Sequence, residues 1–134
     1  MNTIKGFFQV SLFFFACGFT PLLADQSTSI KLEIERAIGK GVKWLNQEQN
    51  RSSGHWGEAD YPALTALALR ATMGHPDELV VAQYSSNQIK GFSFLLSKVQ
   101  SDGGIYGKGL ACYNTSICMM ALLQSKNPEY EKII

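Results

Sequence analysis

The sequence predicts an all-α fold built from paired helices, and three observations lead to this prediction. Apolar side chains recur at helical spacing along residues 30–48. The segment PALTALALRAT that follows is dominated by Ala and Leu, which is typical of a buried helix with close neighbours. The same pair of segments returns about 50 residues later, so the repeats cover about 38–73 and 88–124. Repeated pairs of this kind predict an outer and an inner layer of helices.

Residues 1–24 are expected to be a secretory signal peptide and not part of the fold. Lys5 supplies a positive start, and the apolar run GFFQVSLFFFACGF has the length of a signal-peptide core. Pro21 then breaks the helix, and the small residue Ala24 suits a cleavage point. The mature chain would begin at Asp25 and be exported to the periplasm or the cell exterior.

Two alternatives for this first segment stay open. The run over residues 6–24 is nearly long enough to anchor an uncleaved chain in a bilayer. Cys17 could also carry a lipid, although Phe stands where lipoprotein signals usually have Leu. In each case the domain that remains to fold is residues 25–134.

The first copy of the repeat reads as helix, loop, helix. The first helix runs to the end of residues 30–48, and Asn50 to Gly54 has the composition of a turn. Pro62 suits the first position of the second helix, with Asp60 or Tyr61 at the cap.

The second copy is predicted to follow the same order. One helix lies between residues 77 and 100, and the glycine-rich loop SDGGIYGKG comes after it. The next helix is expected to be capped by Asn114 or Thr115 and to run through TSICMMALL. The pair Asn127-Pro128 then opens a fifth helix.

A shift of 50 residues aligns the two copies residue by residue. The identities are Lys40 with Lys90, Gly41 with Gly91, Leu45 with Leu95, Gly54 with Gly104, Gly57 with Gly107, Thr65 with Thr115 and Ala71 with Ala121. Among the conservative matches are Trp44 with Phe94, Trp56 with Tyr106 and Leu69 with Met119. Only the glutamine is displaced, Gln49 lying against Gln100.

The repeated motif resembles the QW motif of the squalene–hopene and oxidosqualene cyclases and, more distantly, the repeats of protein prenyltransferase β subunits. The full match is Lys40, Gly41, Trp44, Leu45, Gln49, Gly54 and Trp56. The near match is Lys90, Gly91, Phe94, Leu95, Gln100, Gly104 and Tyr106, with the glutamine one residue late and Tyr in place of Trp. The resemblance implies an αα-toroid, of which this chain holds about two repeats. It also implies a structural motif, in which the glutamine caps a helix end, the aromatic ring lies beside it and the glycine makes a tight turn.

The catalytic residues of these families are not found at matching positions. Cyclases of this kind place their acid in an Asp-x-Asp-Asp-Thr-Ala run, and the corresponding residues here are Tyr61, Ala63 and Leu64, then Ala111, Tyr113 and Asn114. Asp60 is a weak catalytic candidate, expected to be a helix cap instead. A prenyltransferase zinc site needs an Asp, Cys and His set, which neither Cys112 nor Cys118 belongs to. No metal and no cofactor are therefore expected.

Charge and cysteine content exclude little else. The formal net charge is +1 and the basic residues are scattered, so no nucleic-acid partner is expected. Cys118 falls in an apolar helical run and is predicted to be a buried thiol, while a disulfide with Cys112 stays open.

Two functions of different class remain. The first is a non-catalytic, exported repeat protein that binds an apolar or isoprenoid ligand or a protein partner, or serves as a scaffold. The alternative is a partial terpenoid cyclase-like enzyme acting on an isoprenoid. The missing acid and the export signal favour the first. Because the end helices of a repeat array need cover, self-association or a longer toroid is also expected.

Overall fold

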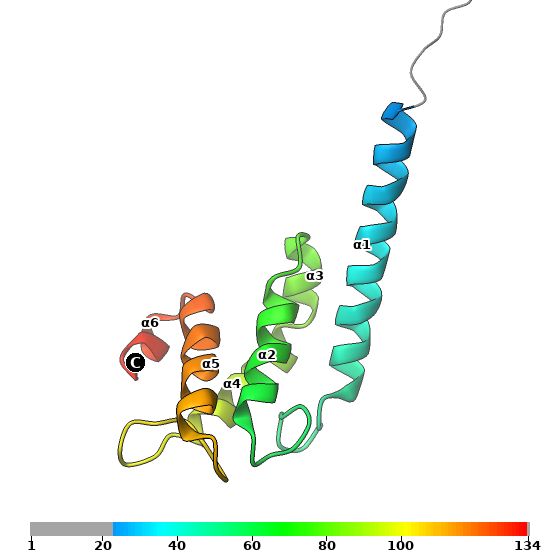
Figure 1. Ribbon diagram of the computed structural model, residues 1–134. Helices are drawn as coiled ribbons and strands as arrows, with labels where there is room; N and C mark the ends of the chain where they lie inside the picture. The colour runs from blue at the N-terminus through cyan, green and yellow to red at the C-terminus, as the bar shows by residue number, and fades with distance from the viewer. Residues whose placement is uncertain (1–22, 134) are drawn as a thin grey trace, which may run out of the picture.

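The computed structural model describes residues 23–133 and consists of helices joined by loops (Figure 1). The helices are α1 (Leu23–Glu48), α2 (Pro62–Met73), α3 (Glu78–Gln83), α4 (Ser85–Leu96), α5 (Ala111–Gln124) and α6 (Pro128–Glu131). The all-α class is therefore confirmed. The expected signal peptide and the alternative anchor lie almost entirely outside the described residues. None of the helices within 23–133 has both the length and the apolarity needed to cross a membrane.

Helix α2 lies at the centre of the packing. It packs most extensively against α5, then against α4, and less against α1. In Figure 1, α1, α2 and α5 run side by side, with α4 behind α2 and α5. The core is formed where these helices meet, and its buried residues are Trp56, Ala66, Ala68, Leu69, Phe92, Phe94, Leu95, Ile105, Cys118, Ala121 and Leu122.

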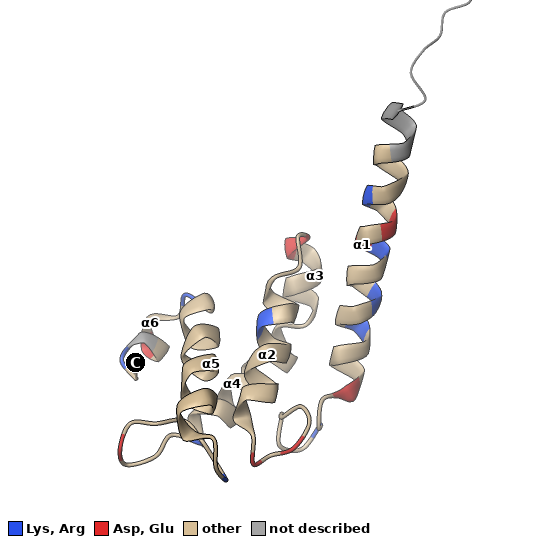
Figure 2. Cartoon of the chain, viewed as in Figure 1, with Lys and Arg blue, Asp and Glu red and all other residues tan. Residues whose placement is uncertain are grey.

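Small residues explain why α2 and α5 can lie so close together. Ala63, Ala66 and Ala121 are almost fully buried, and each offers only a methyl group to its neighbours. Helix α5 carries no charged residue and α2 carries only Arg70. Figure 2 accordingly shows α5 and most of α2 free of charged residues, which lie along α1, in the loops and also on α3 and α6. The predicted burial of α2 holds on most sides, but Leu64 and Leu67 remain partly open to solvent.

Helix α1 is longer than its sequence pattern predicts. It begins at Leu23, and its first half projects beyond the other helices (Figure 1). The apolar stripe of this half has no cover within the described residues, since Ile30 and Ile34 are about half exposed. Only the last turns of α1 reach the core, where Leu45 is partly buried.

The helix starts agree only in part with the predicted caps. Tyr61 occupies the cap position of α2 and is one of the two residues predicted there, although its side chain makes no cap hydrogen bond, and Asp60 lies in the loop before it. Helix α5 begins earlier than expected, at Ala111, with Leu110 at its cap in the left-handed region (φ 49°). Asn114 therefore lies inside its helix and is not the cap of α5. The prediction failed because local sequence shows a cap-type residue but not which helix it caps.

The single helix expected between residues 77 and 100 is two helices. Tyr84, at φ −103° and ψ 16°, separates α3 from α4. The Asp77 side chain caps α3 by accepting from the Leu79 amide. As predicted, Asn127-Pro128 opens a further helix, α6, whose cap is the Asn127 side chain.

Candidate functional site

Gln49 joins the first copy of the repeat to the second. This residue is buried just after the end of α1. Its side-chain Nε2 donates to the carbonyl of Gly54 at 2.7 Å and to the carbonyl of Asn87 at 2.8 Å. The first bond closes the loop after α1, and the second reaches the first turn of α4. Asn87 also bonds to α1, since its side-chain Nδ2 donates to the Asn46 carbonyl at 3.4 Å.

Trp56 caps the C-terminal end of α1 from the side. Its indole Nε1 donates to the carbonyl of Leu45, one of the last-turn carbonyls that have no partner within the helix. The Trp56 backbone amide donates to Thr65 Oγ1 in α2 at 3.0 Å. One residue thus ties the loop to both helices of the first copy.

Two glycines let the copies approach each other. Gly54 has φ +78°, and a Cβ at this position would lie 2.6 Å from the Lys90 carbonyl oxygen. Gly91 is buried in α4, where a Cβ would lie 2.9 Å from both Leu69 Cδ2 and Trp56 Cζ3. Each contact joins the first copy to the second, so neither position has room for a side chain.

The second copy uses its loop differently, which corrects the predicted pairing of Trp56 with Tyr106. Ile105, not Tyr106, donates its amide to Thr115 Oγ1, at 2.9 Å. Ile105 is also almost fully buried, as Trp56 is. Gln100 bonds only within its own part of the chain, to the carbonyls of Lys98 at 3.1 Å and Tyr106 at 2.7 Å.

Ile105 takes the place of Trp56 because the turn that follows the first helix is one residue shorter in the second copy. The amide of Gly54 donates to the carbonyl of Asn50, four residues before it, whereas that of Gly103 donates to Gln100, three before it. Gly103, at φ +83°, therefore takes the conformation that Gly54 has in the first copy.

Tyr106 and Gly104 help to close this second loop around Asp102. The Gly104 amide and the Tyr106 hydroxyl donate to the two Asp102 carboxylate oxygens at 2.9 and 2.8 Å. The hydrogen bond from the Gly104 backbone amide and, second, the one from the Tyr106 hydroxyl lower the pKa of Asp102. The same carboxylate raises the pKa of the Tyr106 hydroxyl.

The remaining motif residues have different surroundings in the two copies. Phe94 is buried beside His55, with ring centroids 5.1 Å apart, whereas its counterpart Trp44 is 58% exposed. Both lysines are exposed, but the Lys90 ammonium donates to the Arg51 carbonyl at 3.5 Å.

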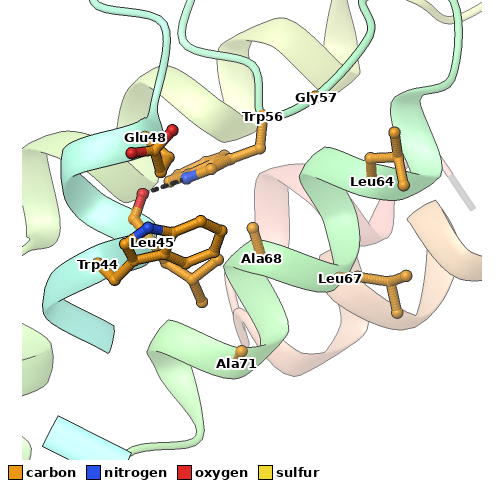
Figure 3. A pocket seen from close by; sticks show the side chains of 9 residues that line it. All are labelled: Trp44, Leu45, Glu48, Trp56, Gly57, Leu64, Leu67, Ala68 and Ala71. Carbon is orange, nitrogen blue, oxygen red and sulfur yellow. Dashed lines mark hydrogen bonds between the residues drawn. The ribbon is translucent and has the colours of Figure 1, made fainter. Parts of the chain in front are cut away.

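An apolar cleft of about 450 Å³ lies between the end of α1 and the exposed side of α2 (Figure 3). Trp44 and Trp56 both line it, with Leu45 between them and Ala68 facing them from α2. The other lining residues are Glu48, Gly57, Leu64, Leu67 and Ala71. Glu48 supplies the carboxylate of this lining, at the rim formed by the last turn of α1. The cleft can therefore hold an apolar body against two indole rings.

The weak catalytic candidate and the cysteines lie elsewhere. Asp60 is exposed in the loop before α2, where its backbone carbonyl accepts from the Lys108 amide at 3.2 Å, and it does not line the cleft. Both described cysteines are free. Cys112 is exposed, whereas Cys118 is buried as predicted, and burial raises its pKa to about 12.

Sequence reasoning missed Asn87 and assigned Asn114 to the cap of its own helix, although both asparagines join the copies. Besides Asn87, the fully buried Asn114 accepts from the Ala63 amide at 3.1 Å and so caps α2 from α5. Its Nδ2 donates to the carbonyls of Gly109 and Leu110 at 3.2 and 3.1 Å. A polar residue inside an otherwise apolar run was the available signal, because a buried amide requires partners.

Comparison of the chain with protein-family models, with curated proteins and with solved structures found no match.

Proposed function

We propose that this protein is an exported, non-catalytic helical-repeat protein of the αα-toroid class, which binds an apolar ligand in the cleft between α1 and α2. The observation that carries the proposal is the cleft itself. It has a volume of about 450 Å³, within the range of roughly 300–1,000 Å³ that is usual for small-molecule sites. Two tryptophans on one side and small or aliphatic residues on the other form its walls.

The toroid class is supported by the way the copies are joined. The bond from Gln49 to Asn87 and the cap from Asn114 to Ala63 each connect one helix pair to the next. Such connections suit an array in which equivalent pairs stack in sequence. The family resemblance and the export signal remain part of this proposal.

The lining supports binding over catalysis by general acid. Glu48 is exposed, and a carboxylate in contact with water is a poor donor to an alkene. Leu64 and Leu67 are each more than 40% exposed, so a ligand would cover apolar surface there. The ligand class that fits is a hydrocarbon chain or an isoprenoid with at most a small polar end.

Tryptophan fluorescence tests the proposal directly, because the chain contains two tryptophans and both line the cleft. We expect titration with farnesol, or with dodecanol as an unbranched alcohol, to shift and saturate the emission. Leu67→Asp places a charge in the lining at an exposed position. Since burying a Leu side chain is worth about 1.5–3 kcal/mol, this variant should bind about 10–100-fold more weakly.

Leu79→Asp is the matched control, since Leu79 is an exposed leucine on α3 and does not line the cleft. It should bind as the unchanged protein does. Circular dichroism must show that both variants fold. Equal affinity in the Leu67 and Leu79 variants, or no saturable change with either alcohol, would reject the cleft as the binding site.

A further inference from the structure

The two copies of the repeat differ in what covers their first helix. In the second copy, Gly91 is covered by Leu69 and Trp56 of the first copy, and Phe94 is covered by His55. In the first copy, a Cβ on Gly41 would meet no atom within 4 Å, and Trp44 is 58% exposed. We call Gly41 and Trp44 the head face.

The head face continues an apolar surface of α1. Ile38 and Ile34 lie one and two turns before Gly41 on the same side of the helix, and both are exposed. A groove formed by Ile38, Gly41, Val42, Trp44, Leu45 and Ala71 runs along this surface and joins the ligand cleft.

The other end of the repeat carries the matching partner surface. Leu69, which covers Gly91 inside the chain, corresponds to Met119 of α5, and Met73 corresponds to Leu123. Leu69 is fully buried and Met73 packs against the core, whereas Met119 is half-buried and Leu123 is 53% exposed. We call Met119 and Leu123, one turn apart on α5, the tail face.

We propose that the head face of one molecule docks on the tail face of a second copy of this chain. The contact repeats, between molecules, the packing that Leu69 makes on Gly91 within the chain. A second copy of this chain is the partner that the repeat itself suggests. The head face matches the surface around Gly91, the tail face matches the surface around Leu69, and these two surfaces already pack together once within the chain. The association is head-to-tail, so each molecule uses two different surfaces. It does not depend on the proposed ligand.

Variants of the two faces test the proposal by analytical ultracentrifugation without ligand. Gly41→Leu places a large side chain in the open space at Gly41 on the head face, and Leu123→Glu places a charge on the tail face. Gly39→Leu is the matched control, since a Cβ at Gly39 also meets nothing within 4 Å, but the residue points to another side of α1. The unchanged chain and the control should associate more as concentration rises. Each face variant should associate at least about thirtyfold more weakly, as expected when a central contact of an interface is lost.

Mixing the two face variants separates head-to-tail docking from a symmetric dimer. The Gly41→Leu chain keeps its tail face and the Leu123→Glu chain keeps its head face, so an equal mixture should form a one-to-one complex that stops at two molecules. Circular dichroism must show both variants folded. A monomeric unchanged chain at every concentration, undiminished self-association of Leu123→Glu, or no complex in the mixture would each overturn the proposal.

Trp44 belongs to both the head face and the ligand cleft, so the two tests are separated by variants that change only one of these surfaces. Leu67→Asp changes the cleft and leaves both faces intact, so it should still associate. Gly41 does not line the cleft, so Gly41→Leu should still bind farnesol. Loss of ligand binding and loss of association can therefore be told apart.

Discussion

Replacing Gln49 by methionine should destabilise the protein more than the same change at Gln100. Methionine keeps the length of the side chain and removes both of its amide donors. At Gln49 the carbonyls of Gly54 and Asn87 then lose their donors, at 2.7 and 2.8 Å, in a buried place. At Gln100 the carbonyls of Lys98 and Tyr106 are affected, but this residue is only half-buried and water can reach the loop.

The size of the effect follows from the number and burial of the lost bonds. A buried polar group left without a partner costs about 1–3 kcal/mol, so the two carbonyls that lose their donor at Gln49 give about 2–6 kcal/mol. At Gln100, where water replaces the amide, the net loss should be close to the ordinary contribution of a hydrogen bond, about 0.5–1.5 kcal/mol. Of the two residues, only Gln49 also connects the first copy of the repeat to α4.

Urea unfolding followed by circular dichroism measures both free energies of unfolding, at a fixed low protein concentration so that association does not contribute. The slope of each transition should stay unchanged, because the exposed surface on unfolding is the same. Equal losses of unfolding free energy in the Gln49 and Gln100 variants would refute the reasoning. The buried bond from Gln49 to the Asn87 carbonyl would then contribute no more than a bond within a single loop.

Three further predictions concern the helix contacts, the buried thiol and the first segment. Gly91→Ala should destabilise the protein, because the added Cβ would lie 2.9 Å from Leu69 and Trp56. Gly41→Ala should stabilise it by about 0.5–1 kcal/mol, because the site is open and alanine favours the helix more than glycine does. Urea unfolding of both variants measures the two changes. A thiol reagent should label the exposed Cys112 while the buried Cys118 stays protected, and rapid labelling of Cys118 in the folded protein would contradict this. Because burial raises the pKa of Cys118 from 9.0 to about 12, the stability that its protonated thiol contributes should be complete below pH 9 and decline between pH 9 and 12. Mass spectrometry of protein from its native host should show Asp25 as the first residue; an intact Met1 or a lipid on Cys17 would contradict the signal peptide.

The sequence alone was enough for the features that depend on local periodicity and composition. The 3.6-residue spacing and the Ala- and Leu-rich second segment predicted helices, and the structure has them. An apolar run around Cys118 predicted its burial, because a helix that is apolar nearly all round is covered on most sides. The proline after Asn127 likewise predicted the start of α6.

The tertiary structure decided which atoms meet across the chain. The loop shortened by one residue moves Ile105, and not Tyr106, into the core position of Trp56, a shift that an alignment of side-chain types does not show. Asn114 has the composition of a cap for α5, yet the position of α5 beside α2 directs its oxygen to Ala63. The same packing covers Phe94 and leaves Trp44 open over the cleft, although the two residues hold equivalent places in the repeat. Sequence periodicity reports which side of a helix is apolar, and only the neighbouring helices determine what that side contacts.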